Sequence, residues 1–150
     1  MRRLVATALF SGLLLTGCGG SSKPVSVYAR QYLAIIAPAN RALDVFNAGL
    51  KALPSSPTGA DYVRVTNPLA VAFNAAREEL LQVSWPANTL GDVEAVTVAI
   101  SAVDADLTKT ATVNAITFRA WQDHLSTDLD RILAPTDRVR ADLRLPLGKA

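Results

Sequence analysis

The apolar side chains that follow Lys23 recur every three or four residues, which is the spacing of one face of an α-helix. No segment shows the sustained alternation of apolar and polar residues that is typical of a half-buried strand. The first apolar stripe covers residues 25–53 and predicts one helix of about 28 residues. Pro38 lies inside this stripe, so we expect a kink near residues 35–37, because proline removes a backbone hydrogen bond.

The second stripe covers residues 62–83, and two different signals compete for the start of its helix. Thr58 and Asp61 have the spacing of a capping box, in which each side chain accepts a hydrogen bond from the other residue's backbone N–H. Asn67-Pro68 is the competing start, because proline is favoured at the first position of a helix. The sequence leaves the choice between them open.

The third helix is expected to open at Thr89, which again has an acidic residue three positions later, Asp92. Its stripe runs through residues 93–107. Residues 108–112 are polar and rich in threonine, so we expect a turn there.

The fourth stripe covers residues 116–132 and is expected to end at Pro135-Thr136, which leaves residues 139–143 for one last short helix. Four apolar-striped helices joined by short polar loops predict an all-α fold. The architecture that we expect is an antiparallel four-helix bundle in up-down order, formed by residues 25–150.

A different pattern precedes the bundle. Arg2 and Arg3 are followed by an uncharged apolar run of 12 residues, 4–15. As a helix this run would rise about 18 Å, which is too short for a hydrocarbon core of about 30 Å. A basic start, a short apolar run and small residues beyond it indicate an export signal rather than a membrane span.

The residues Leu15-Thr16-Gly17-Cys18 resemble the lipobox of bacterial lipoproteins, in which an apolar residue and two small residues precede a lipid-accepting cysteine. The resemblance implies that the cysteine thiol takes a diacylglyceryl group as a thioether, that a peptidase cleaves before Cys18, and that acyl chains such as palmitate anchor the product. Residues 1–17 are then a lipoprotein signal peptide, and residues 18–24 are the lipidated cysteine and a short flexible tether rich in glycine and serine. The alternative is a conventional signal peptide in which Cys18 is only a small apolar residue.

The charge and cysteine content fit an exported protein without a nucleic-acid partner. The chain has 15 basic and 13 acidic side chains, and without Arg2 and Arg3 the numbers are equal. The sequence pI of about 8.9 therefore gives no indication of nucleic-acid binding. Cys18 is the only cysteine, as expected for a chain that enters an oxidising compartment without a spare thiol. We expect an exported protein, lipid-anchored to the outer face of the cell membrane or of another envelope membrane.

The mature sequence also resembles a wider group. Residues 32–43 (YLAIIAPANRAL) and Trp85-Pro86, together with a composition in which 11 arginines stand against 4 lysines, are similar to small actinobacterial lipoproteins of unassigned function. That resemblance implies a lipid-anchored domain in the cell envelope and supplies no catalytic residues.

The titratable residues favour a protein without an active site. His124 is the only histidine, and Asp128 lies one helical turn away, where it could orient the imidazole of a general base. Ser126 lies about 200° around the same helix, so it cannot serve His124 as a nucleophile. The metal centres of helical bundles need a Glu-x-x-His motif on two helices, which one histidine cannot supply. We expect no metal, no cofactor and no catalytic residue, and a solvated pair of His124 and Asp128.

Four aromatic residues are candidates for a ligand groove, namely Tyr28, Tyr32, Trp85 and Trp121, because aromatic rings with a polar tip suit such sites. At helical spacing, the same residues more often form part of a core. The basic tail over residues 137–149 is a candidate for contact with anionic lipid head groups, and the alternative is an amphipathic segment packed on the bundle.

The function that we expect is that of a non-enzymatic, lipid-anchored envelope protein. Its helical bundle would bind or scaffold another envelope protein or a small apolar molecule. One alternative is an envelope hydrolase that uses His124 with aspartates from neighbouring helices. Another is a membrane-surface sensor that works through the basic tail.

Overall fold

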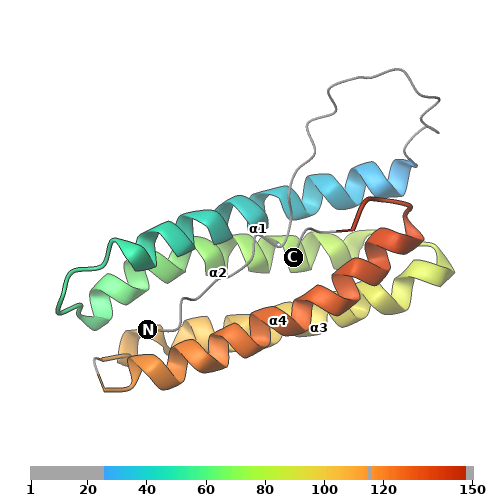
Figure 1. The fold of residues 1–150 in the computed structure, drawn as a ribbon. Helices are drawn as coiled ribbons and strands as arrows, with labels where there is room; N and C mark the ends of the chain where they lie inside the picture. The colour runs from blue at the N-terminus through green and yellow to red at the C-terminus, as the bar shows by residue number, and fades with distance from the viewer. Residues whose placement is uncertain (1–25, 115, 148–150) are drawn as a thin grey trace.

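The computed structural model describes residues 26–114 and 116–147 (Figure 1). These residues form four long helices and one short 3-10 helix, and no strand occurs among them. The helices are α1 (Val27–Lys51), α2 (Gly59–Gln82), α3 (Ala87–Thr108), η1 (Lys109–Thr112) and α4 (Phe118–Asp142). The predicted signal peptide, Cys18 and the predicted tether lie outside the described residues.

The four helices run antiparallel to one another in chain order (Figure 1). Helix α1 packs against α2, α2 packs against α3, and α3 packs against α4, so helices that follow one another in the chain are neighbours in space. The 3-10 helix η1 contacts α2 and α3 at one end of the bundle. The predicted all-α four-helix bundle in up-down order is confirmed.

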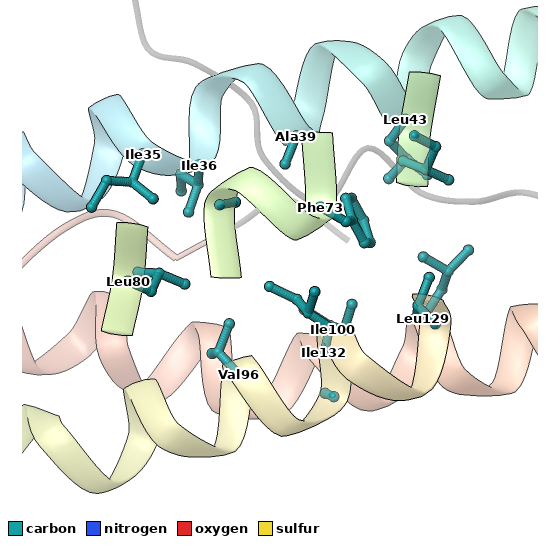
Figure 2. Packing of buried hydrophobic residues seen from close by; sticks show 14 of the residues in the cluster. Ile35, Ile36, Ala39, Leu43, Phe73, Leu80, Val96, Ile100, Leu129 and Ile132 are labelled. Carbon is teal, nitrogen blue, oxygen red and sulfur yellow. The ribbon is translucent and has the colours of Figure 1, made fainter. Parts of the chain in front are cut away.

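One hydrophobic core runs along the middle of the bundle, and each long helix contributes the buried stripe that its sequence predicts. In Figure 2, Leu43 of α1 points toward Leu129 of α4, and Phe73 of α2 lies between α1 and Ile100 of α3. Closing the core with side chains from all four helices makes each helix dependent on the others, because isolated helices of this length are marginal in water.

The first helix extends without interruption through Pro38 and ends at Lys51. It begins at Val27, and Ser26 is its N-terminal cap. The Ser26 side chain accepts a hydrogen bond of 3.1 Å from the backbone N–H of Ala29. The observed helix has 25 residues, close to the expected length. The kink that we expect near residues 35–37 stays a prediction.

The capping box decides where α2 begins. The Thr58 hydroxyl accepts a hydrogen bond of 3.3 Å from the Asp61 backbone N–H, and the Asp61 carboxylate accepts one of 2.9 Å from the Thr58 backbone N–H. The competing start at Asn67-Pro68 is wrong, because Pro68 lies inside α2. The two cap bonds satisfy N–H groups that a helix start leaves unpaired, which favours the earlier position.

The third helix starts two residues earlier than the sequence predicts. It begins at Ala87, and Thr89 is a buried residue of the first turn rather than its cap. The backbone carbonyl of Pro86 accepts hydrogen bonds from the N–H groups of Thr89 and Leu90. Asp92 does not complete a capping box, because its carboxylate pairs with Arg138 of α4 at 2.5 Å.

The prediction that Pro135-Thr136 ends the fourth helix is wrong. Helix α4 continues to Asp142, so residues 139–143 do not form a separate short helix. Val139 and Leu143 are buried and continue the apolar face of α4 beyond the proline. Burial of these side chains outweighs the single backbone hydrogen bond that proline removes.

The two ends of the bundle differ in what they contain. We call the end that is nearest in sequence to Cys18 the proximal end; it consists of residues 26–32, 81–90 and 136–147 (Figure 1). The distal end consists of residues 49–62, 107–114 and 116–121. Across residues 26–114 and 116–147, every helix is too short or too polar to cross a membrane.

Candidate functional site

Three of the four candidate ligand residues lie together at the proximal end. The ring centroids of Tyr28 and Trp85 are 6.2 Å apart, and Tyr32 meets Trp85 edge to face, also at 6.2 Å. The Trp85 indole N–H donates a hydrogen bond of 2.8 Å to the backbone carbonyl of Leu80. This bond holds the connection between α2 and α3 against the end of α2. The Trp85 ring therefore packs against the start of α1.

Burial differs among the three rings. Tyr32 and Trp85 are buried, whereas Tyr28 is half-buried at the rim of the bundle. Tyr32 and Trp85 are therefore core residues first, as the alternative interpretation of the sequence allowed. Only Tyr28 presents much of its ring to the outside, where a ligand or a surface can reach it.

Trp121, the fourth candidate, lies in a separate aromatic cluster at the distal end. Its ring packs against Phe118 at 5.8 Å and Tyr62 at 6.3 Å, and Tyr62 stacks on Phe118 at 4.9 Å. The Trp121 indole N–H donates a hydrogen bond of 3.0 Å to the backbone carbonyl of Asp106. The four candidates therefore do not share one groove, because α1 begins at the proximal end and α4 begins at the distal end.

Polar groups are buried beside Tyr32 at the proximal end. The hydroxyl groups of Tyr32 and Thr136 lie near each other, and neither makes a hydrogen bond to a described residue. Arg140 is only 3% exposed, and its Nε donates a hydrogen bond of 2.6 Å to the backbone carbonyl of Pro146. This bond folds the chain after α4 back against the last turns of the helix.

Burial raises the pKa of the Tyr32 hydroxyl to about 12, and the neighbouring Thr136 and Arg140 act more weakly in the opposite direction. Tyr32 is therefore protonated at neutral pH and can donate a hydrogen bond but cannot act as a base. Sequence analysis missed Thr136 and Arg140, because it placed the end of the helix before them. The signal that could have identified them is the continued apolar spacing through Val139 and Leu143.

His124 is exposed on α4. Asp128, its expected partner, instead forms an ion pair of 2.6 Å with Arg131. Among the residues that the structure describes, His124 makes no hydrogen bond to a hydroxyl or a carboxylate. The structure thus does not bring a nucleophile and an orienting acid to this imidazole.

Two aspartates of α3 stabilise the bundle through polar contacts. The Asp104 carboxylate accepts a hydrogen bond of 2.8 Å from the amide of Asn74, which joins α3 to α2. Asp106 pairs with Lys109 at 2.8 Å, at the junction of α3 and η1. Within the described ranges, no three side chains from the set His, Cys, Asp and Glu gather where a metal ion would need them.

The basic tail is also largely used within the fold. Arg138 pairs with Asp92 of α3, and Arg140 is buried against Pro146, so two of its bases are held by the bundle itself. Arg144 is exposed just beyond α4. The tail is therefore mainly a part of α4, as the packed alternative predicts.

Comparisons with protein-family models, with curated proteins and with solved structures give no match to this chain.

Proposed function

We propose that this protein is a lipid-anchored component of a bacterial cell envelope, held to the membrane through a lipidated Cys18. The observation that carries the proposal is the order of signals in residues 1–18: two arginines, an apolar run of 12 residues, and the lipobox-like Leu15-Thr16-Gly17-Cys18. Each part is what an export and lipidation signal requires at that place.

The position of the bundle supports this division of the chain. Helix α1 begins at Val27, nine residues after Cys18. The described residues close their own hydrophobic core, to which all four long helices contribute. A core formed by side chains from Ala29 onward is compatible with removal of a leader and attachment of lipid at Cys18.

We further propose that the bundle is a non-catalytic binding or scaffolding module. The support lies in how its polar side chains are used: Asp92, Asp104 and Asp106 join helices or cap them, and His124 stands alone on an exposed face. The partner would be another envelope protein or a small apolar molecule.

Detergent partitioning of the full chain expressed in a bacterial host tests the anchor. Wild-type protein should enter the detergent phase of a two-phase extraction and incorporate a fatty acid added to the culture. The Cys18→Ala variant should do neither, whereas Ser22→Ala, a matched change in the same segment, should behave as wild type. Detergent partitioning of the Cys18→Ala variant would refute the lipid anchor.

Crosslinking of the natively lipidated protein tests the binding module. Affinity capture followed by mass spectrometry should recover one defined protein or lipid in wild-type and His124→Ala samples alike. Turnover of an envelope substrate that disappears in His124→Ala, at unchanged protein level, would instead support the hydrolase.

A further inference from the structure

We propose that the proximal end of the bundle is a membrane-contact surface, on which the domain rests with its helices standing steeply on the bilayer. This inference deepens the proposed function and rests on the lipid anchor at Cys18. It assigns the occupant of the proximal end as the bilayer that carries the anchor, rather than a second protein.

The length of chain between the anchor and the bundle limits where the domain can sit. Val27 is nine positions after Cys18, and the chain between them spans at most about 32 Å even when fully extended. Helix α1 has 25 residues and is therefore about 37 Å long. The proximal end is always within reach of the bilayer. The distal end can touch it only if the bundle lies flat or is inclined, because an upright bundle resting on its distal end would need a tether of about 37 Å.

The exposed apolar side chains discriminate between these two orientations. All three exposed leucines of the described chain lie at the proximal end: Leu81 is 61% exposed, Leu90 is 43% exposed and Leu147 is 60% exposed. Val27, the first residue of α1, is 59% exposed at the same end. These four side chains come from the start of α1, from both sides of the connection between α2 and α3, and from the chain after α4.

The remaining exposed large apolar residues have a different distribution. Those on the helices are valines at separate positions, and Ile116 lies at the distal end. They are Val45, Val63, Val71 and Val98. Scattered exposed valines are ordinary on a protein surface, whereas a group of leucines at one end is not.

The accessible ring of Tyr28 reinforces the assignment to a bilayer. Tyr28 is half-buried at the proximal rim, and its ring lies against Trp85. Tyrosine and tryptophan are enriched at the level of lipid head groups, where an apolar ring and a polar tip are both accommodated. Leu81 lies in the last turn of α2 and Leu90 in the first turn of α3, on either side of the connection that holds Trp85.

The charge at the proximal end is largely compensated, because Arg30, Arg138, Arg140 and Arg144 share this end with Asp137, Asp142 and the nearby Asp92. Arg138 is paired with Asp92, and the exposed Arg144 lies two residues after the acidic Asp142. A flat orientation would instead press the charged helix sides, such as that of Arg41 and Asp44 on α1, against the lipid. The contact that we propose is therefore apolar and insensitive to salt, unlike binding through a basic tail.

The test uses the full lipidated protein in vesicles of neutral phosphatidylcholine. The lipid blocks the only native thiol, so an engineered cysteine takes a fluorophore that reports polarity at one site. We compare Leu90→Cys at the proximal end with Ser55→Cys in the exposed connection between α1 and α2. The fluorescence emission of the label at position 90 should shift to the blue, and spin-labelled lipid should quench it at least twofold, at low and high salt alike. The emission of the label at position 55 should be that of the fluorophore in water.

Replacement of the neighbouring leucines provides the second variant. Leu81→Ser with Leu147→Ser should abolish the blue shift of the label at position 90. Val71→Ser, which changes an equally exposed apolar residue on the side of α2, should leave it unchanged. All three substitutions are on exposed side chains, so the fold should survive them.

Four outcomes would overturn the proposal. Both labels in water would mean that the domain stands away from the membrane, and both labels shielded would mean that it lies flat. A blue shift that requires anionic lipid and disappears in salt would assign the contact to the basic tail. Shielding that already occurs in detergent and grows with protein concentration would mean that a second copy covers this end. Intact mass of the same sample reports lipidation separately, so failure of the anchor is distinguishable from failure of the contact.

Discussion

The backbone carbonyl oxygen of Ala111 lies 2.7 Å from the point that a Cβ atom on Gly59 would occupy. Gly59 is the first residue of α2, and Ala111 belongs to η1, so the absence of a side chain lets the connection between α3 and α4 approach the start of α2. No real Cβ is tolerated at this distance from backbone, because a carbonyl in a helix cannot move aside as a flexible side chain can.

Gly59→Ala should therefore lower the free energy of unfolding, by about 1–3 kcal/mol, which is typical of overpacking. Gly91→Ala is the matched control, because a Cβ at Gly91 meets no atom within 4 Å. Alanine in the middle of a helix is favoured over glycine by about 0.5–1 kcal/mol, so this variant should be more stable than wild type. Urea unfolding followed by circular dichroism measures both, and equal effects would contradict the close contact at Gly59.

The capping box predicts a pH dependence of stability in acid. The hydrogen bond from the Thr58 backbone N–H, together with that from its hydroxyl, holds the pKa of Asp61 below its ordinary value of 3.8. A carboxyl whose pKa is lower in the folded state stabilises the fold at pH values above its unfolded pKa. The contribution is lost as the pH falls below about 4 through the folded pKa.

Asp61→Asn should consequently destabilise the protein at pH 7 and have a smaller effect at pH 3. Arg64→Ala provides a control, since it removes the ion pair of 2.9 Å with Asp61 and leaves both cap hydrogen bonds. Thermal unfolding at the two pH values gives the comparison. A difference between Asp61→Asn and wild type that is the same at both pH values would show that the carboxylate charge plays no part in the cap.

Tyr32 predicts the opposite dependence in alkali. Its pKa is raised from 10.0 to about 12 by burial, so the folded state disfavours the phenolate. The contribution of the protonated Tyr32 to the free energy of unfolding is complete below pH 10. It is lost as the pH rises from 10 toward 12. Tyr32→Phe should be more stable than wild type by roughly 1 kcal/mol at pH 7, because it removes a buried hydroxyl without a hydrogen-bond partner.

The same variant should also unfold at a higher pH. An alkaline titration that follows helicity together with tyrosinate absorbance measures this shift. A Tyr32→Phe variant that is less stable than wild type would show that the hydroxyl has a partner after all, the adjacent Thr136 being the candidate.

His124→Ala tests whether the single histidine has any role. Its side chain is exposed on α4, so the substitution should change the free energy of unfolding by less than about 0.5 kcal/mol. Localisation and the envelope phenotype of the host should also be unchanged. Loss of function at normal protein level and helicity would contradict the assignment of a non-catalytic bundle.

Most of the fold follows from the spacing of apolar residues, and the errors have a common cause. The stripes define four helices, and Thr58 with Asp61 defines a start, because both signals act within one helix. Whether the fourth helix ends at Pro135 depends instead on whether Val139 is buried against the other helices, which is a property of the whole bundle. Tertiary burial overrode the local signal there.

The candidate site was predictable only in part, for a related reason. Tyr28, Tyr32 and Trp85 lie together because α1 begins where α2 ends, whereas Trp121 begins a helix at the other end. A sequence pattern gives residue types and helix faces but not which ends meet. The burial of Arg140 was missed because arginine is ordinarily solvated.

The measurement that tests the central claim most directly is the intact mass of full-length protein expressed in a bacterial host and extracted in detergent. The account predicts a polypeptide of residues 18–150 with the added mass of a diacylglyceryl group, and of a further acyl chain where the host attaches one. Fragmentation should place that mass on Cys18. A mature chain that begins at another residue, or one that begins at Cys18 with a free thiol, would contradict it.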